Sequence, residues 1–503
     1  MKYPAILLGL AALVLATSSA AEAVTSLEGY TEAFTQVSGE SRVWRLDNPQ
    51  ILGELRLIAG PWKDTQGFLK MQALSNRWDK ERWKNFFFLK EGHLKFRASR
   101  VEAYLFTGQD RFWLNEPLLN MVSQDVIKDD DNGPKAQGVR LDAWNLWGFT
   151  FAGFYSDKST QYPAILNPDI ATGNAAYLAD IVSTDDYVGG RVRRPLLRDK
   201  LVFGGTFARK EYTDSTSARK YPSRSHERDV VAGVDVEAAL GELVPPLSRL
   251  GRTSFFAEAG RNFSGWLGDR RPSGWKVEIR DIGYGPLTFV GSLHDFDYDF
   301  YTLGLARGDI WDDNDYHGHY AEVNYRLPRK AINLKGWRLR DKPHTATATR
   351  RSFEETGGEV YVEFQRGFRG KVSYKRFINK DGTWPNLLFE VTGENKLAKI
   401  RTQFRIKDMG TNYQVRIYGF EVDANLTEKW KFFTRLLTVD EKTEARESIF
   451  AQLFYRGWQG AEFFVEYGDW SQSNDLANTE GFVSHESSAT TTRVFKIFLK
   501  LYY

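Results

Sequence analysis

Carboxyl and imidazole side chains are concentrated between residues 294 and 319. They are His294, Asp295, Asp297, Asp299, Asp309, Asp312, Asp313, Asp315, His317 and His319. Carboxylates at this density can bind Ca²⁺, and the histidines can bind a transition metal. An acidic run in a long polar loop is more often a solvated surface. We therefore assign no metal site and no cofactor from the sequence, and metal binding by this loop stays open.

Motifs for catalysis are missing from the sequence. It has no Gly-x-Ser-x-Gly, no His-Glu-x-x-His and no Gly-x-x-x-x-Gly-Lys. The acidic run at 129–133 fails the EF-hand pattern, because Lys128 stands at the first ligand position. The chain has no cysteine, which excludes disulfides, thiolate metal sites and a c-type haem of its own. We predict that the chain is not an enzyme, and a hydrolase is the least favoured alternative.

Charged and apolar side chains alternate in several short stretches, most clearly at 397–407. The charged positions that we select are Lys371, Lys375, Lys399, Arg401, Arg405, Lys431 and Arg435, with Glu359 and Glu363. A period of two residues is typical of a β-strand with one apolar face. Two hypotheses follow. Basic and acidic side chains on neighbouring strands neutralise each other, or a basic stripe guides anionic or sugar-like solutes.

These charged faces require many strands to position them. From residue 138 to residue 502 the alternation recurs in stretches of about ten residues, a length that matches a tilted span across a bilayer. Short connections alternate with long polar ones. The pattern predicts about 20 strands, within a range of roughly 16 to 22. For residues 22–92 two interpretations stay open: further strands, or in part a periplasmic lead-in or plug. The aromatic patch 78–89 has no assignment.

The N-terminal residues have the pattern of an export signal. Lys2 precedes an apolar run, Ala5–Leu15, and small residues that extend to Ala21. We therefore predict a signal peptide at 1–21 and one large unit at 22–503. Charged residues make up 26% of the chain and the mean hydropathy is −0.46, so no further segment qualifies as a transmembrane helix. The formal net charge of +3 gives no support for nucleic-acid binding.

The final stretch of the chain, 493–503, ends on an aromatic residue. One face of it carries Phe495, Ile497, Leu499, Leu501 and the terminal Tyr503, and the other face is mixed. This pattern resembles the closing strand of Gram-negative outer-membrane β-barrels, in which a terminal aromatic residue lies in the rim girdle. The resemblance implies an all-β fold, a transmembrane antiparallel up-and-down barrel, with short turns in the periplasm and long loops outside.

The function that the resemblance implies is a porin-like channel, through which small hydrophilic solutes diffuse passively. The implied location is the outer membrane. The implied partners are outer-membrane lipid, lipopolysaccharide and the barrel-assembly machinery, which would bind the C-terminal strand. A monomer and a homotrimer both stay open. The alternative is a structural barrel that surrounds a periplasmic partner, such as an electron-transfer protein.

Overall fold

A computed structural model describes most of the chain. The described residues are 24–40, 43–46, 50–62, 64–79, 82–107, 114–119, 137–157, 185–212, 228–263, 270–297, 300, 315–327, 331–345, 352–365, 367–379, 382–442, 445–468 and 493–502. The predicted signal peptide, the acidic run at 129–133 and Tyr503 lie outside these ranges.

The described residues form one antiparallel sheet of 25 strands. In chain order the strands are β1 (Val24–Glu40), β2 (Val43–Leu46), β3 (Gln50–Trp62), β4 (Thr65–Asp79), β5 (Arg82–Ala98), β6 (Val101–Thr107), β7 (Gln137–Leu146), β8 (Phe149–Asp157), β9 (Asp185–Leu196), β10 (Leu201–Tyr212), β11 (Arg228–Ala238), β12 (Ser254–Asn262), β13 (Ser273–Tyr284), β14 (Leu287–Phe296), β15 (Tyr316–Arg326), β16 (Ile332–Pro343), β17 (Phe353–Gln365), β18 (Phe368–Asn379), β19 (Gly382–Glu394), β20 (Ala398–Lys407), β21 (Val415–Asn425), β22 (Trp430–Glu441), β23 (Ala445–Trp458), β24 (Ala461–Tyr467) and β25 (Arg493–Tyr502).

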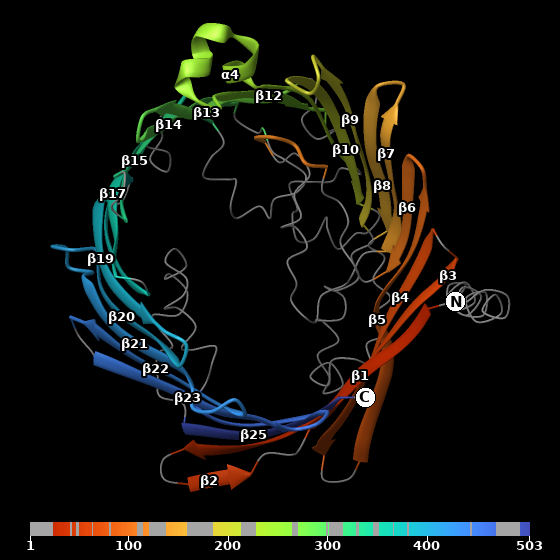
Figure 1. Cartoon of the computed structure of the whole chain (residues 1–503), viewed down its shortest axis with the longest axis vertical. Coiled ribbons are helices and arrows are strands. Elements are labelled where there is room, and N and C mark those ends of the chain that lie inside the picture. Colours follow the sequence, from red (N-terminus) through yellow and green to blue (C-terminus); the bar gives the residue numbers. More distant parts are fainter. Residues whose placement is uncertain are drawn as a thin grey trace.

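The strands follow one another in an up-and-down order around a ring (Figure 1). One edge of β1 pairs with β25, where Tyr30 lies opposite Tyr502. The other edge pairs first with β3 and then with the short β2, so β2 and β3 lie end to end along the same strand. The predicted all-β antiparallel barrel fold is confirmed. The predicted range of 16 to 22 strands is wrong, because the structure has more.

The additional strands come from the N-terminal part of the chain. The stretch that the sequence left open, 22–92, contributes β1 to most of β5, and the unassigned patch 78–89 lies at the end of β4 and in β5. The run Phe86-Phe87-Phe88-Leu89 does not alternate with polar residues. A two-residue alternation of apolar and polar side chains is therefore not detected here in the sequence, although the pairing of β5 with β4 shows that this run is part of a strand.

Connection lengths differ between the two ends of the sheet. Short turns join β7 to β8 and β13 to β14, and Gly148 and Gly285 adopt positive φ angles of 80° and 59° in these turns. The connection between β11 and β12 at this end carries the helices α4 (Leu240–Leu243) and η5 (Pro245–Leu250). β25 also ends here, since Tyr502 N–H donates to the carbonyl of Gly460 in the β23–β24 turn. At the other end of the sheet, longer stretches of sequence separate β8 from β9, β10 from β11 and β24 from β25.

No helix among the described residues is both long and apolar enough to cross a membrane.

The two faces of the sheet differ in polarity. Large apolar side chains on the outer face are exposed, with Val234 at 66%, Leu293 at 55% and Phe203 at 48%. On the opposite face of the same strands, Asp235 and Thr206 are buried. This division is the one that a wall between lipid and an aqueous interior requires.

Candidate lumen constriction and interior surface

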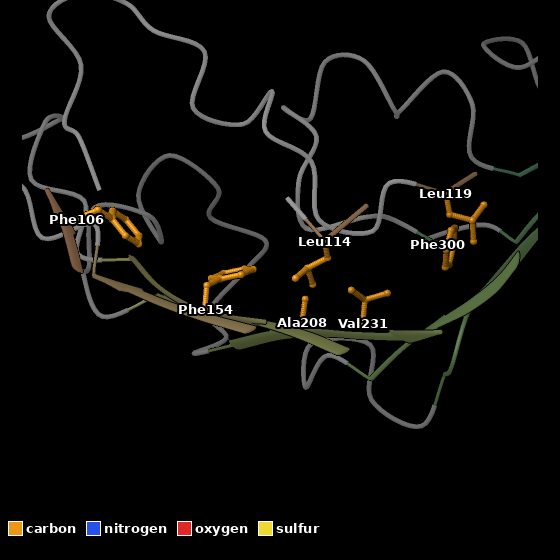
Figure 2. Close-up of a cluster of buried hydrophobic side chains, with 7 residues drawn as sticks. All are labelled: Phe106, Leu114, Leu119, Phe154, Ala208, Val231 and Phe300. Carbon is orange, nitrogen blue, oxygen red and sulfur yellow. The ribbon is translucent and has the colours of Figure 1, made fainter. Parts of the chain in front are cut away.

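The segment Leu114–Leu119, which follows β6 in sequence, lies inside the ring of strands (Figure 1). Leu114 and Leu119 are 2% and 7% exposed and form one apolar cluster with side chains of the wall (Figure 2). The other members of the cluster are Phe106, Phe154, Ala208, Val231 and Phe300. Most of these belong to the strands β6, β8, β10 and β11, so the segment rests on the interior face of the sheet.

Small wall residues leave room for this contact. A side chain on Gly189 of β9 would place its Cβ 2.6 Å from the ring of Phe154 and 3.5 Å from Leu114 Cδ1. Ala208 lies directly opposite Gly189 on β10. The infolded segment therefore packs over a part of the wall from which bulky side chains are missing.

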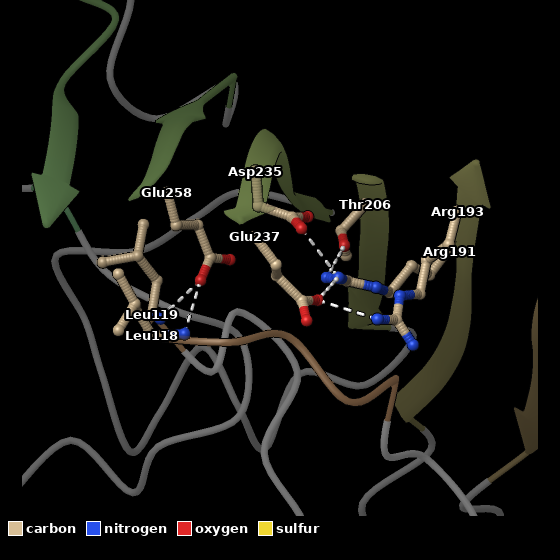
Figure 3. A network of polar contacts seen from close by, with 8 residues as sticks. All are labelled: Leu118, Leu119, Arg191, Arg193, Thr206, Asp235, Glu237 and Glu258. Carbon is tan, nitrogen blue, oxygen red and sulfur yellow. Dashed lines mark hydrogen bonds and ion pairs between the residues drawn. The ribbon is translucent and has the colours of Figure 1, made fainter. Parts of the chain in front are cut away.

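One buried carboxylate holds the backbone of the segment. Oε2 of Glu258, on β12, accepts hydrogen bonds from the backbone N–H groups of Leu118 at 2.8 Å and Leu119 at 2.7 Å (Figure 3). Glu258 is 2% exposed. Its other oxygen, Oε1, has no hydrogen-bond partner in the part of the chain that the structure describes. The two hydrogen bonds make Glu258 a polar anchor of the segment.

Beside this anchor, β9, β10 and β11 contribute a charged network (Figure 3). Arg191 donates to Asp235 at 2.8 Å and to Thr206 Oγ1 at 3.3 Å, and both members of the ion pair are buried. Arg193 donates to Glu237 at 2.9 Å. A buried guanidinium needs such partners, since an unpaired charge away from water is costly. The network therefore keeps this part of the wall rigid beneath the infolded segment.

The predicted interior residues can be placed by following the strand register. Residues directly opposite each other on paired strands project to the same face, and Glu258 on the interior face fixes which face that is. Continued from β12 to β22, the register puts all the selected positions on the interior face: Glu359, Glu363, Lys371, Lys375, Lys399, Arg401, Arg405, Lys431 and Arg435. Their contact with a passing solute stays a prediction.

Several of these side chains form ion pairs between strands. The N–O distances are 2.8 Å for Lys371–Glu359, 2.9 Å for Lys375–Glu355, 2.7 Å for Arg435–Glu421 and 3.9 Å for Arg401–Glu390. Lys399, Lys431 and Glu363 have no ion-pair partner among the described residues. This geometry favours the hypothesis of mutual neutralisation over an unbroken basic stripe.

The acidic and histidine-rich stretch is divided between the two faces. His294 lies 3.0 Å from Asp341 on the interior face, and Asp295 lies 2.8 Å from His344 on the outer face. Asp297 accepts from the backbone and hydroxyl of Ser273. Within the described ranges no group of three or more acidic, histidine or cysteine side chains is arranged to hold a metal ion. Asp299, Asp309, Asp312 and Asp313 lie outside the described residues.

The infolded segment and its anchor were not found from the sequence. The alternation at 186–194 and 229–239 places Arg191 and Asp235 on charged faces, so this pair could have been selected. No local signal marks Leu114–Leu119, because its polar partner Glu258 lies about 140 positions further along the chain.

Comparisons with known proteins bear on the fold. No protein-family model and no curated protein sequence matches the chain. A solved P pilus tip assembly intermediate of E. coli, which contains PapC, PapD, PapK and PapG, matches with a TM-score of 0.54 and 9% identity over 94% of this chain and 60% of that chain.

Two further structures match less well. The P pilus usher (PapC) translocation pore has a TM-score of 0.43 and 8% identity, over 95% of this chain and 99% of that one. A BenF-like porin from Pseudomonas fluorescens has a TM-score of 0.37 and 14% identity, over 73% and 97%. The structural neighbours of this chain are outer-membrane β-barrel proteins, and no specific family is identified.

Proposed function

We propose that this chain is an outer-membrane channel for small hydrophilic solutes, and that the infolded segment Leu114–Leu119 sets the width of its bore. The observation that carries the proposal is the attachment of that segment to the interior wall through Glu258. A segment fixed by a buried carboxylate and an apolar cluster is a built part of the interior. The apolar outer face supports a location in a membrane.

Selectivity for charge is expected to be weak. The interior cations at Lys371, Lys375 and Arg435 each lie beside a carboxylate, so their fields largely cancel over a short distance. The size of a solute and its hydrogen-bonding capacity then matter more than its charge. No covalent step is involved, and solutes move down their gradients.

The number of strands favours a second candidate, a barrel that holds a plug or a partner. Barrels of about 16 to 18 strands leave an aqueous channel, while barrels of about 22 strands have a plugged lumen. The ring exceeds both numbers even when β2 and β3, which lie end to end, are counted as one strand, so it encloses more room than one short segment fills. A sheath around a periplasmic partner is the form of this candidate that the sequence suggested.

Conductance in a planar bilayer separates the two candidates. The purified chain is inserted between KCl solutions of different concentration, and current steps and reversal potential are recorded. A channel gives steady, uniform steps and a reversal potential near zero. A silent or erratic record from folded protein contradicts the channel and supports the plugged or sheath barrel.

The same recording tests the role of the ion pairs. Glu355→Gln removes the partner that lies 2.9 Å from Lys375, so one interior cation is no longer neutralised. We expect the reversal potential to shift toward anion preference, with little change in step size. A shift toward cations, or no shift, would show that these side chains do not face the conducting path.

A further inference from the structure

Basic side chains gather on the outer face of β16 and β18, where apolar contact with lipid would otherwise be expected. The cluster consists of Arg338, Arg340 and Lys342 on β16 and Arg376 on β18. Trp337 and Lys375, their neighbours in sequence, lie on the interior face, where Trp337 Nε1 and Lys375 Nζ both contact Glu355. Because successive strand residues point to opposite faces, the four cations point outward.

Negative charge on this outer face does not balance the cations. Glu354 is the one carboxylate on the described outer face of β16, β17 and β18. It lies 3.2 Å from Arg338 and 4.0 Å from Arg340. Arg376 and Lys342 have no ion-pair partner among the described residues. The side chains of Arg338 and Arg340 are 52% and 42% exposed, so the excess positive charge faces outward unneutralised.

The cluster lies at one edge of the apolar band. Leu334, Val360 and Val372 stand opposite one another in a single outward row. Arg338, Thr356 and Arg376 form a parallel row four residues further along, roughly 13 Å nearer the end that carries the long connections. A cation at the middle of a bilayer costs about 2 to 4 kcal/mol on a barrel surface, whereas near the interface this cost falls to about zero to 1 kcal/mol. The position suits cations that meet lipid headgroups.

The geometry points to a binding site for the phosphate groups of an anionic lipid of the outer leaflet, the lipid anchor of lipopolysaccharide. This inference rests on the proposed outer-membrane location. Guanidinium groups match phosphate oxygens through paired N–H donors, which makes arginine the residue suited to such a site. Arg338 and Arg376 are two strand spacings apart, roughly 10 Å, so the two arginines can contact separate phosphates of one headgroup.

A titration with lipid A tests this site. Fluorescent diphosphorylated lipid A is added to the full-length protein in detergent, and affinity is compared between the wild type and the triple variant Arg338→Gln, Arg340→Gln and Arg376→Gln. We expect about 100-fold weaker binding, since each of the three cations near an anionic lipid surface contributes about 1 kcal/mol, roughly a factor of five. The triple Arg→Lys variant keeps the charge and retains most of the affinity.

A matched control is Arg416→Gln. Arg416 also lies on the outer face toward the long connections, but it is paired with Asp440 at 3.7 Å. Its loss is expected to change the affinity less than twofold. An equal loss in this control, equal binding of fully dephosphorylated lipid A, or full competition by inorganic phosphate at matched concentration would overturn the lipid site. Bilayer conductance of the triple variant should match the wild type, which keeps this test separate from that of the channel.

Discussion

Removal of the Glu258 carboxylate is expected to release the infolded segment. In Glu258→Ala the backbone N–H groups of Leu118 and Leu119 lose the acceptor that lies 2.8 and 2.7 Å away. A hydrogen bond contributes about 0.5 to 3 kcal/mol, with the upper part of the range for charged partners, so the two bonds together contribute about 1 to 6 kcal/mol to attachment. The apolar contacts of Leu114 and Leu119 remain.

The predicted effect on the channel follows from this loss. A change of 3 kcal/mol raises the ratio of released to attached segment by about 150-fold. Overall stability should fall by less than the attachment energy, because the variant also removes a buried carboxyl group whose second oxygen has no partner among the described residues. The barrel therefore stays folded while its segment detaches more often.

Single-channel recording measures this release directly. We expect Glu258→Ala to show larger or more variable current steps than the wild type, and Glu258→Gln, which keeps the shape and one neutral acceptor, to lie between the two. The reasoning is refuted if Glu258→Ala is folded, as judged by its far-ultraviolet circular dichroism, and conducts with the same step size and noise as the wild type.

Two other substitutions test the interior face through stability in detergent. Arg435→Met should lower the unfolding free energy by about 3 to 5 kcal/mol in chemical denaturation, because it leaves the buried Glu421 carboxylate without the guanidinium that lies 2.7 Å away. If the unpaired carboxylate causes this loss, adding Glu421→Gln should restore most of the lost stability. Gly204→Ala places a Cβ 2.2 Å from the carboxylate of Asp235 and should lower the unfolding free energy by about 1 to 3 kcal/mol. The matched control Gly205→Ala has no atom nearer than 3.8 Å to its Cβ and should change the unfolding midpoint little. Equal effects of the two substitutions would contradict the assignment of Gly204 to the interior face and Gly205 to the outer face.

The features of the fold that could be predicted from the sequence depend on local alternation. Residues 398–407 alternate strictly, and Lys399, Arg401 and Arg405 lie on the face opposite the exposed Ile400. In β25, Ile497 and Leu499 share one face, as predicted, and are exposed at 37% and 36%. In each case one face must be apolar to meet lipid, so the period of two determines both the strand and its orientation.

The features that the sequence did not predict depend on partners far along the chain. β5 begins with an aromatic run, and its identity as a strand follows from pairing with β4 and β6. Leu114–Leu119 has no regular structure, and its place follows from Glu258 and from the open surface around Gly189. The strands that pair with β5 and the wall residues that contact Leu114–Leu119 cannot be identified from the sequence without knowledge of which strands lie side by side in the ring.

The most direct test of the central claim uses two adjacent residues on opposite faces of β18. In the protein alone Tyr374 is exposed on the outer face and Lys375 is partly exposed on the interior face, so neither residue is buried by the protein itself. The chain has no cysteine, so Tyr374→Cys and Lys375→Cys each introduce a single thiol. Labelling with a charged, water-soluble maleimide is measured for each variant in outer-membrane vesicles.

A wall with lipid outside and water inside predicts rapid labelling of Lys375→Cys and protection of Tyr374→Cys until the membrane is dissolved. Equal labelling of both thiols in intact membranes would contradict the account.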